Sequence, residues 1–204
     1  MKEESLVSEE KKVMGSPSGK TMKEIRLHGR GGQGMVMAAE MLVNAILLEG
    51  LYGNSIPYFG FERRGAPVAA FVRFDQKPIR EKTQIYYPDC LIVSDDTLLR
   101  TVDVFGGLRG EGIMVLNTQK ALDNLAFPKT VGKVGLVPAT KVAIDILGDP
   151  ITNTAMLGAF AATTGWVSLN SVLVGIEKVM PSRIASKNMK AAEVSFEKTE
   201  IHWV

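Results

Sequence analysis

The sequence predicts an α/β fold, a layered domain in which helices flank a mixed β-sheet. Three observations lead to this class. Short apolar segments typical of strands alternate with longer segments of helical pattern. A glycine-rich turn joins a strand to a helix near the N-terminus, and the C-terminal third of the chain is helical in pattern. The length of 204 residues is enough for one domain with a sizeable core.

The first strand, the glycine turn and the first helix form the clearest local pattern. Residues 23–28 alternate apolar and polar side chains, as on a half-buried strand. Residues 29–34 are the glycine cluster, and residues 35–49 form a long apolar helix that Gly50 ends. The sequence therefore predicts a strand, a glycine loop and a buried helix in direct succession.

A second pair of strands follows this unit. Residues 51–59 read as an extended segment that ends in aromatic side chains, and residues 67–74 alternate like a third strand. Only a short arginine-rich loop separates the two segments. We therefore expect no crossover helix between them.

The remaining elements are short buried strands and longer helices. Strands are expected at residues 90–93, 113–116 and 133–137, and helices at 139–147, on either side of 165–170, and at about 182–198. The acidic turn Ser94-Asp95-Asp96 predicts a helix cap. No internal repeat accompanies these elements.

The N-terminus and one uncharged segment indicate where in the cell the protein is located. Residues 1–20 are charged and rich in Ser, Gly and Pro, so we expect a flexible tail, with residues 21–204 as a single domain; a docking arm is the alternative for the tail. The tail lacks the apolar run of a secretory signal. Residues 151–176 carry no charge, but polar side chains divide them into two buried helices. We therefore expect a cytoplasmic protein without a membrane span.

The composition excludes several classes of site. Lys and Arg total 24 against 22 Asp and Glu, which argues against a bulk nucleic-acid binder or a polybasic membrane binder. Cys90 is the single cysteine, so this chain alone has no disulfide framework, iron–sulfur cluster or cysteine-rich zinc site. His28 and His202 are the two histidines, which leaves little for a metal centre. We expect no metal site.

The glycine loop is the principal candidate for ligand binding. Gly29, Gly31 and Gly34 satisfy G-x-G-x-x-G, and the amides at a helix N-terminus favour an anion. One alternative is a tight turn without a ligand. Another is a nicotinamide or flavin dinucleotide fold, but residues 54–59 lack the carboxylate expected about 20 residues on. A phosphate-bearing ligand of another kind fits better.

Four motifs together support a resemblance to a known family. They are Gly-Arg-Gly-Gly-Gln-Gly at 29–34, Phe-Gly-Phe-Glu-Arg-Arg-Gly-Ala-Pro-Val at 59–68, Val-Pro-Ala-Thr at 137–140 and Asn-Thr-Ala-Met-Leu-Gly-Ala at 153–159. With them, the chain resembles the gamma subunit of the 2-oxoacid:ferredoxin oxidoreductases, and most of all the pyruvate branch. The resemblance covers about Met22 to the C-terminus.

The resemblance implies a subunit of a larger enzyme that is not active alone. Such an enzyme converts pyruvate, coenzyme A and oxidised ferredoxin into acetyl-CoA, carbon dioxide and reduced ferredoxin, reversibly. The implied partners are alpha, beta and delta subunits, which hold thiamine diphosphate, Mg and [4Fe-4S] clusters, and ferredoxin interacts through the complex. Two alternatives stay open: a gamma subunit for branched-chain 2-oxoacids such as 2-ketoisovalerate, and a structural subunit without ligand contact. An independent kinase or reductase is disfavoured, because the loop lacks a Gly-Lys-Ser/Thr ending.

The implied role for this chain is to bind part of coenzyme A, as a substrate. The candidate residues are Gly29, Arg30, Gly31, Gly32, Gln33, Gly34, Arg63, Arg64 and Asn153. The backbone of the loop would cradle a phosphate, with Arg30 as a charged clamp and Gln33 as an amide donor.

Three of these candidates have a second interpretation. Arg63 and Arg64 could hold phosphate by bidentate contacts, or pair with Glu62 and a neighbouring subunit. Asn153 with Thr154 also predicts a cap for a helix starting near Ala155. We expect no catalytic residue on this chain.

Cys90 and His28 are expected to have structural roles. Cys90 lies in an apolar run, which is typical of an inert buried thiol. His28 precedes the glycine loop and could face a ligand, but a hydrogen-bonded structural imidazole is the simpler prediction.

Overall fold

The computed structural model describes residues 21–58 and 64–204. The predicted tail at 1–20 lies outside this part, as do Glu62 and Arg63. The strands are β1 (Lys23–Arg30), β2 (Tyr52–Tyr58), β3 (Pro67–Asp75), β4 (Cys90–Val93), β5 (Gly112–Asn117), β6 (Val131–Val137) and β7 (Glu200–Trp203). The helices are α1 (Met35–Leu48), α2 (Ala139–Leu147), α3 (Asn153–Thr164), α4 (Leu169–Val179) and α5 (Ser182–Glu197), with short 3-10 helices η1 (Asp96–Arg100) and η2 (Leu122–Asn124).

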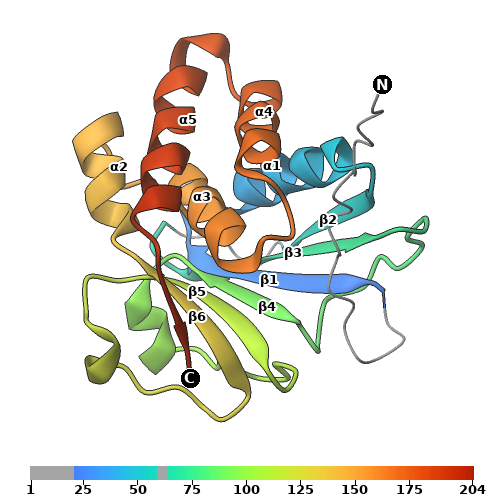
Figure 1. The fold of residues 1–204 in the computed structure, drawn as a ribbon, viewed down its shortest axis with the longest axis vertical. Coiled ribbons are helices and arrows are strands. Elements are labelled where there is room, and N and C mark those ends of the chain that lie inside the picture. Colours follow the sequence, from blue (N-terminus) through green and yellow to red (C-terminus); the bar gives the residue numbers. More distant parts are fainter. Residues whose placement is uncertain (1–20, 59–63) are drawn as a thin grey trace, which may run out of the picture.

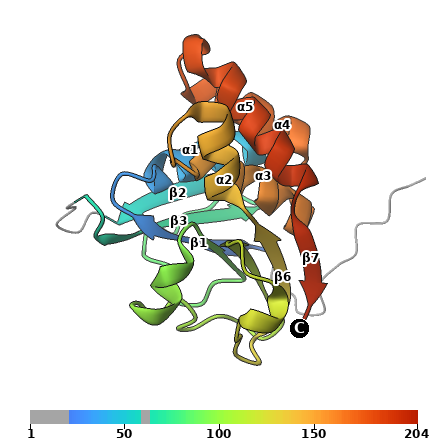
Figure 2. The same cartoon turned by 90° about the vertical axis from the view of Figure 1, so that its left-hand side faces the viewer.

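The described strands form one mixed seven-stranded sheet in the order β2-β3-β1-β4-β5-β6-β7. Helices α1 to α5 lie over one face of this sheet, and loops with the two 3-10 helices cover the other (Figures 1 and 2). The predicted α/β class, the layers and the helical C-terminal third are therefore confirmed.

The central strands run parallel, which gathers their carboxyl ends at one edge of the sheet. β1 pairs with β4, β4 with β5, and β5 with β6 in parallel. β2 and β3 are an antiparallel pair beside β1, so the short connection predicted between them is confirmed. After β1 the chain forms β2 and β3 on one side of β1, and it later forms β4 on the other side of β1. The strand order therefore changes direction at β1, and open α/β sheets bind ligands at such a switch point.

Apolar side chains form a core on each face of the sheet. The larger core lies beneath the helices and includes Ile25, Met41 and Phe160. The smaller one, on the opposite face, includes Leu91 and Leu116. Because both faces are covered, the central strands are buried almost throughout.

Helix α3 is the buried centre of the helical layer. Ten of its twelve residues are buried, so its sequence has almost no polar face. It packs against α5 at Gly158, where an added Cβ would overlap the carbonyl oxygen of Ala192. Glycine at this position therefore lets the two helix backbones approach closely.

The break between α3 and α4 was predicted correctly. Gly165 ends α3 in a left-handed conformation, with φ 62°, and Ser168 caps α4 by accepting a hydrogen bond from the Ser171 amide at 3.1 Å. None of the described helices combines the length and apolar character required to cross a membrane.

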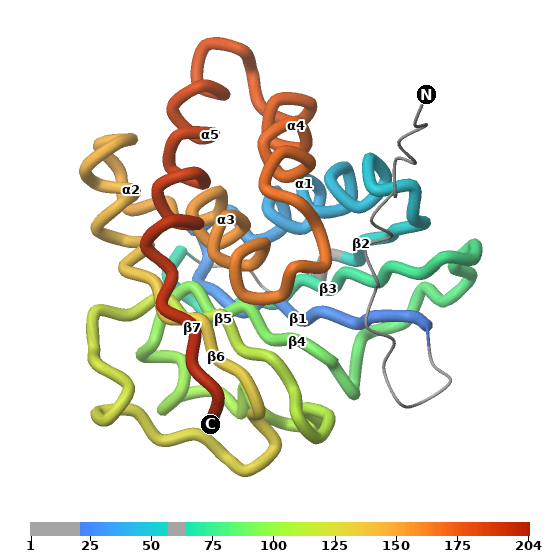
Figure 3. Tube along the Cα trace, viewed as in Figure 1, coloured from blue at the N-terminus to red at the C-terminus, as the bar shows by residue number. Residues whose placement is uncertain are grey.

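Three local expectations were wrong. Strand β1 extends to Arg30, so Gly29 belongs to the strand and not to the loop. Helix α3 begins at Asn153 instead of near Ala155, so Asn153 is its first residue and Thr152 its N-cap. The last helix is followed by β7, which pairs antiparallel with β6 (Figure 3). The sequence lacked a signal for β7 because the strand is four residues long and its apolar side chains are exposed.

Candidate functional site

The glycine loop connects the carboxyl end of β1 to the first turn of α1. Gly32 and Gly34 have φ of 96° and 75°, in the left-handed region that favours glycine. Within the loop, the Gly31 amide donates to Ala66 O at 2.8 Å and the Gln33 amide donates to Arg30 O at 3.0 Å. These amides are therefore already bonded inside the protein.

The amides of Gly32 and Gly34 have no hydrogen-bond acceptor among the described residues. The first-turn amides of α1 lie beyond them, and such amides lack intrahelical partners. Gly29, by contrast, is buried, and a Cβ there would lie 2.5 Å from Met35 Cγ. The part of the loop that can receive an anion is therefore narrower than the six predicted residues.

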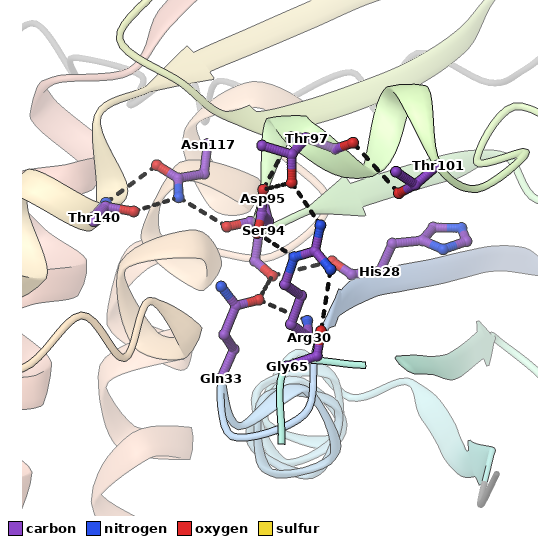
Figure 4. A network of polar contacts seen from close by, with 10 residues as sticks. All are labelled: His28, Arg30, Gln33, Gly65, Ser94, Asp95, Thr97, Thr101, Asn117 and Thr140. Carbon is purple, nitrogen blue, oxygen red and sulfur yellow. Dashed lines mark hydrogen bonds and ion pairs between the residues drawn. The ribbon is translucent and has the colours of Figure 1, made fainter. Parts of the chain in front are cut away.

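Arg30 ties the loop to its surroundings (Figure 4). Its Nε donates to Asp95 Oδ2 at 2.7 Å, and its two terminal nitrogens donate to Thr97 Oγ1 at 2.7 Å and to Gly65 O at 3.1 Å. Burial opposes ionisation of Asp95, but hydrogen bonds from Thr97 and Arg30 outweigh it and lower the pKa of this carboxyl. The ion pair therefore holds the loop against the turn that follows β4.

Gln33 is fixed by its side-chain oxygen. Oε1 accepts hydrogen bonds from the Arg30 amide at 2.7 Å and from Ser94 Oγ at 2.9 Å (Figure 4). Since this pairing occupies the oxygen, the amide nitrogen Nε2 is the atom left to donate, and no described residue accepts from it. Gln33 can therefore present two N–H groups to a ligand, as an amide donor requires.

A polar cleft of about 450 Å³ lies at the carboxyl ends of β1, β4 and β5. Its lining residues are Gln33, Ser94, Asp95, Asp96, Asn117, Thr118, Gln119, Lys120, Thr140 and Pro150. Asn117 donates to Ser94 O at 2.8 Å and to Thr140 Oγ1 at 2.7 Å, while Lys120 pairs with Asp96 at 2.7 Å. Most of these polar groups are thus bonded to one another.

Sequence reasoning missed the residues that line this cleft beyond the loop. Asn117 directly follows the apolar run of β5, and Thr118 comes next. Polar residues immediately after a buried parallel strand are the signal that could have identified them, because such positions meet at one edge of the sheet.

The other side of the glycine loop faces a second hollow, a groove of about 650 Å³. It is lined by Gly32, Gly34, Met37, Leu147, Asp149, Ile151, Asn153, Met180, Arg183, Ile184, Lys187 and Asn188. Asn153 lies directly against the loop, since a Cβ on Gly34 would be 2.6 Å from its Nδ2. The structure therefore brings the predicted residue Asn153 to the glycine loop.

Of the two predicted arginines, Arg64 is among the described residues. Arg64 lies beside the loop, where a Cβ on Gly32 would be 3.7 Å from its Cγ. Arg63 is outside the described residues. The predicted phosphate contacts of both arginines stay predictions.

His28 is a structural residue, as predicted. It is 7% exposed, and its Nε2 accepts a hydrogen bond from Arg26 Nε at 2.9 Å. Burial and then the charge of Arg26 lower the pKa of His28 to about 3. The imidazole is therefore neutral near pH 7.

Cys90 and the acidic residues that the structure describes form no metal site. Cys90 is buried in β4, and burial raises the pKa of its thiol, which makes it an unreactive side chain. Across 21–58 and 64–204, no cluster of His, Cys, Asp and Glu is suited to a metal ion.

Comparison with known proteins gives consistent matches over most of the chain. A family model described as pyruvate ferredoxin/flavodoxin oxidoreductase matches residues 24–198. The chain is 52% identical to the pyruvate/ketoisovalerate oxidoreductases common subunit gamma of Thermococcus kodakarensis, covering 89% of this chain and 99% of the relative. It is 47% identical to pyruvate synthase subunit PorC of Methanothermobacter marburgensis, covering 87% and 97%. The crystal structure of pyruvate oxidoreductase subunit PORC from Thermotoga maritima superposes with a TM-score of 0.76 at 35% identity, covering 89% and 99%.

Proposed function

The chain belongs to the pyruvate ferredoxin/flavodoxin oxidoreductase family, and we propose that it is the gamma subunit of a pyruvate:ferredoxin oxidoreductase that binds part of coenzyme A. The assembled enzyme would convert pyruvate, coenzyme A and oxidised ferredoxin into acetyl-CoA, carbon dioxide and reduced ferredoxin, reversibly. The names of the Methanothermobacter and Thermotoga relatives support pyruvate. The Thermococcus relative is named for both pyruvate and ketoisovalerate, so 2-ketoisovalerate is the second candidate substrate.

The redox groups belong to other subunits in this proposal. An iron–sulfur cluster takes several cysteine thiolates, and Cys90 is the single, buried cysteine of the chain. The residues of this chain therefore do not fit a cluster. Thiamine diphosphate, Mg and the [4Fe-4S] clusters are assigned to alpha, beta and delta subunits in a cytoplasmic complex, and this chain is inactive alone.

The observation that carries the coenzyme A proposal is the pair of side-chain amides beside the glycine loop. Gln33 has its oxygen fixed by two hydrogen bonds, so its nitrogen is left to donate. Asn153 accepts from the Thr154 amide at 2.8 Å through Oδ1, and its Nδ2 lies against Gly34. Gln33 lines the polar cleft, and Asn153 lines the groove on the other side of the loop together with Gly32 and Gly34. Neutral donors on both sides of one loop suit a ligand that carries more than one phosphate.

The hydrogen bonds of Arg30 favour a different role from the charged clamp that the sequence analysis assigned to it. Three of its nitrogens already donate to Asp95, Thr97 and Gly65 O. We therefore assign Arg30 to positioning the loop, and the Gly32 and Gly34 amides, Gln33 and Asn153 to contacts with the phosphates of coenzyme A.

The test is to replace each amide nitrogen while keeping the oxygen that the fold uses. Gln33→Glu and Asn153→Asp retain their acceptor contacts but place a negative charge where a donor was. We expect each to weaken coenzyme A binding to the assembled complex by about tenfold or more, measured by isothermal titration.

Gln76→Glu is the matched control. Gln76 follows β3 at the opposite end of the sheet, since Phe74 pairs with Lys23 at the amino end of β1. This variant adds the same charge and should leave affinity unchanged. Unchanged affinity in both Gln33→Glu and Asn153→Asp would refute the proposed site.

A further inference from the structure

Strand β7 is the outer strand of the sheet and pairs with β6 along one of its two sides. Figure 2 shows it at the margin of the sheet, outside β6. In the described part of the chain, no strand pairs with its other side. An edge strand of this kind leaves backbone N–H and C=O groups unpaired, and a further strand can bind to them.

The backbone groups that face outward belong to Ile201 and Trp203. The Val204 amide donates to Gly132 O at 3.2 Å, so the backbone of Val204 faces β6. Successive residues of an antiparallel strand turn their backbone groups to opposite sides. His202 therefore also faces β6, whereas Ile201 and Trp203 each present one N–H and one C=O to the free side.

The same two residues carry exposed apolar side chains. Ile201 is 42% exposed and Trp203 is 78% exposed. Ile201 pairs with Gly135, and a Cβ on Gly135 would meet Thr163 of α3, so both apolar side chains lie on the helical face of the sheet. The helices leave them uncovered. Adjacent exposed apolar side chains beside unpaired backbone groups indicate an interface.

The opposite edge strand, β2, is less able to bind a further strand. It contains Pro57, which has no N–H to donate. The Asn54 side chain donates to Glu81 O at 3.0 Å, so the segment after β3 lies against this strand. Proline and a covering loop are common features that prevent pairing at a sheet edge. A contact between two copies is therefore better made by β7 with β7 than by β7 with β2.

Strand β7 is complementary to a second copy of itself. Residues that are hydrogen-bonded across an antiparallel pair lie opposite each other and exchange both bonds. With Ile201 of each copy opposite Trp203 of the other, every outward N–H and C=O of both strands has a partner. An aliphatic side chain opposite an aromatic one is also a favourable cross-strand pair.

The other face of the strand is compatible with the same register. His202 lies opposite its own counterpart there, and Glu200 lies opposite Val204. Glu200 approaches His202 within its own strand at 3.7 Å, and the two residues are diagonal neighbours across the pair. An acid therefore meets a histidine and not another acid.

We propose that two copies of this chain pair through β7 in the assembled enzyme, with Ile201 of each copy opposite Trp203 of the other. The two seven-stranded sheets then form one continuous sheet across a two-fold axis at His202, which is a closed contact. None of the residues assigned to coenzyme A lies in this surface, so the inference is independent of the proposed site.

Variants of the outward-facing residues test the pairing in the purified full-length chain. Ile201→Pro removes an N–H that does not face β6, and Trp203→Lys places a charge opposite Ile201. We expect the wild type to form a dimer in analytical ultracentrifugation and each variant to weaken the dimer by about tenfold or more. Tyr52→Lys is the control, because Tyr52 is an exposed aromatic residue on β2 at the opposite edge, and it should leave the dimer unchanged.

Single cysteines test the register in the assembled enzyme. Residues opposite each other in a non-hydrogen-bonded antiparallel pair have Cα atoms about 4.5 Å apart, within the range of a disulfide. On oxidation with copper phenanthroline, His202→Cys should therefore give a covalent dimer of this chain. Glu200→Cys should not, because Glu200 lies opposite Val204. The native Cys90 is buried and contributes no cross-link.

The other outcomes overturn the proposal. A wild-type chain that is monomeric at every concentration, or a dimer that Ile201→Pro and Trp203→Lys leave intact, contradicts pairing through β7. If Ile201→Pro fails to fold, Trp203→Lys decides alone, since its side chain is exposed. Equal cross-linking of Glu200→Cys and His202→Cys refutes the register. A dimer of the purified chain without a His202→Cys cross-link in the assembled enzyme would mean that another subunit covers β7.

Discussion

Arg30 lies inside a glycine-rich motif, where a cation is readily assigned to a phosphate. Its guanidinium instead donates to Asp95, Thr97 and Gly65 O. The sequence could not reveal this, because Asp95 and Thr97 belong to a turn that reaches Arg30 only when β4 pairs with β1. At the scale of single residues, the glycine-rich motif predicted the position of the loop correctly. The role of each residue in the motif, however, depends on the residues that it contacts in the fold.

His28 gives a pH-dependent prediction at the same scale. Its pKa of about 3 in the folded state is below the usual value of 6.5, so the unfolded chain binds the proton first as the pH falls. Stability is therefore lost as the pH drops below 6.5 and toward 3. His28→Gln keeps an acceptor for Arg26 and removes the titration. Its loss of stability between pH 7 and 5 should be smaller than that of the wild type by about 2 kcal/mol.

Urea unfolding of the purified subunit at pH 7 and pH 5 measures this difference. The two proteins differ at position 28 alone, so the difference between them reports on His28. Equal pH dependence in the two proteins would show that His28 is protonated as easily in the folded chain as in the unfolded one.

At the scale of secondary-structure elements, the periodicity of apolar residues predicted an element correctly where one face of that element, or all of it, is buried. The strand, glycine loop and helix at 23–48, and the division of the uncharged stretch into α3 and α4, were predicted from such patterns. Strand β7 was missed because its pairing with β6 depends on backbone hydrogen bonds, which leave no apolar pattern. The start of α3 was misplaced because Asn153 and Thr154 resemble caps, although both are buried within the first turn.

The crossing of α3 and α5 gives a stability prediction at this scale. Gly158→Ala places a Cβ against the Ala192 carbonyl, so the helices must separate. We expect a loss of about 1–3 kcal/mol, typical of overpacking a dense core. Gly110→Ala is the control, since a Cβ there meets no atom within 4 Å, and its stability should be nearly unchanged. Urea unfolding of both variants tests this; a Gly158→Ala protein as stable as the control would contradict the packing argument.

At the scale of the whole molecule, the fold brings the residues of the candidate site together from distant parts of the chain. The parallel strands place the glycine loop beside the turns after β4 and β5, and α3 and α5 bring Asn153, Arg183 and Lys187 to its other side. The sequence located the loop and included Asn153 through the family resemblance. It could not locate Arg183 or Lys187, because an exposed cation on an amphipathic helix looks the same whether or not a groove lies beside it.

The central claim is that coenzyme A contacts the glycine loop of this subunit in the assembled enzyme. Hydrogen–deuterium exchange of the complex, with and without coenzyme A, tests it without any substitution. Amides in the segment 30–38 should exchange more slowly when coenzyme A is bound, because Gly32 and Gly34 gain acceptors, while amides in η2, on the opposite face of the sheet, should not change. Unaltered exchange at 30–38 under conditions where coenzyme A is bound would contradict the account.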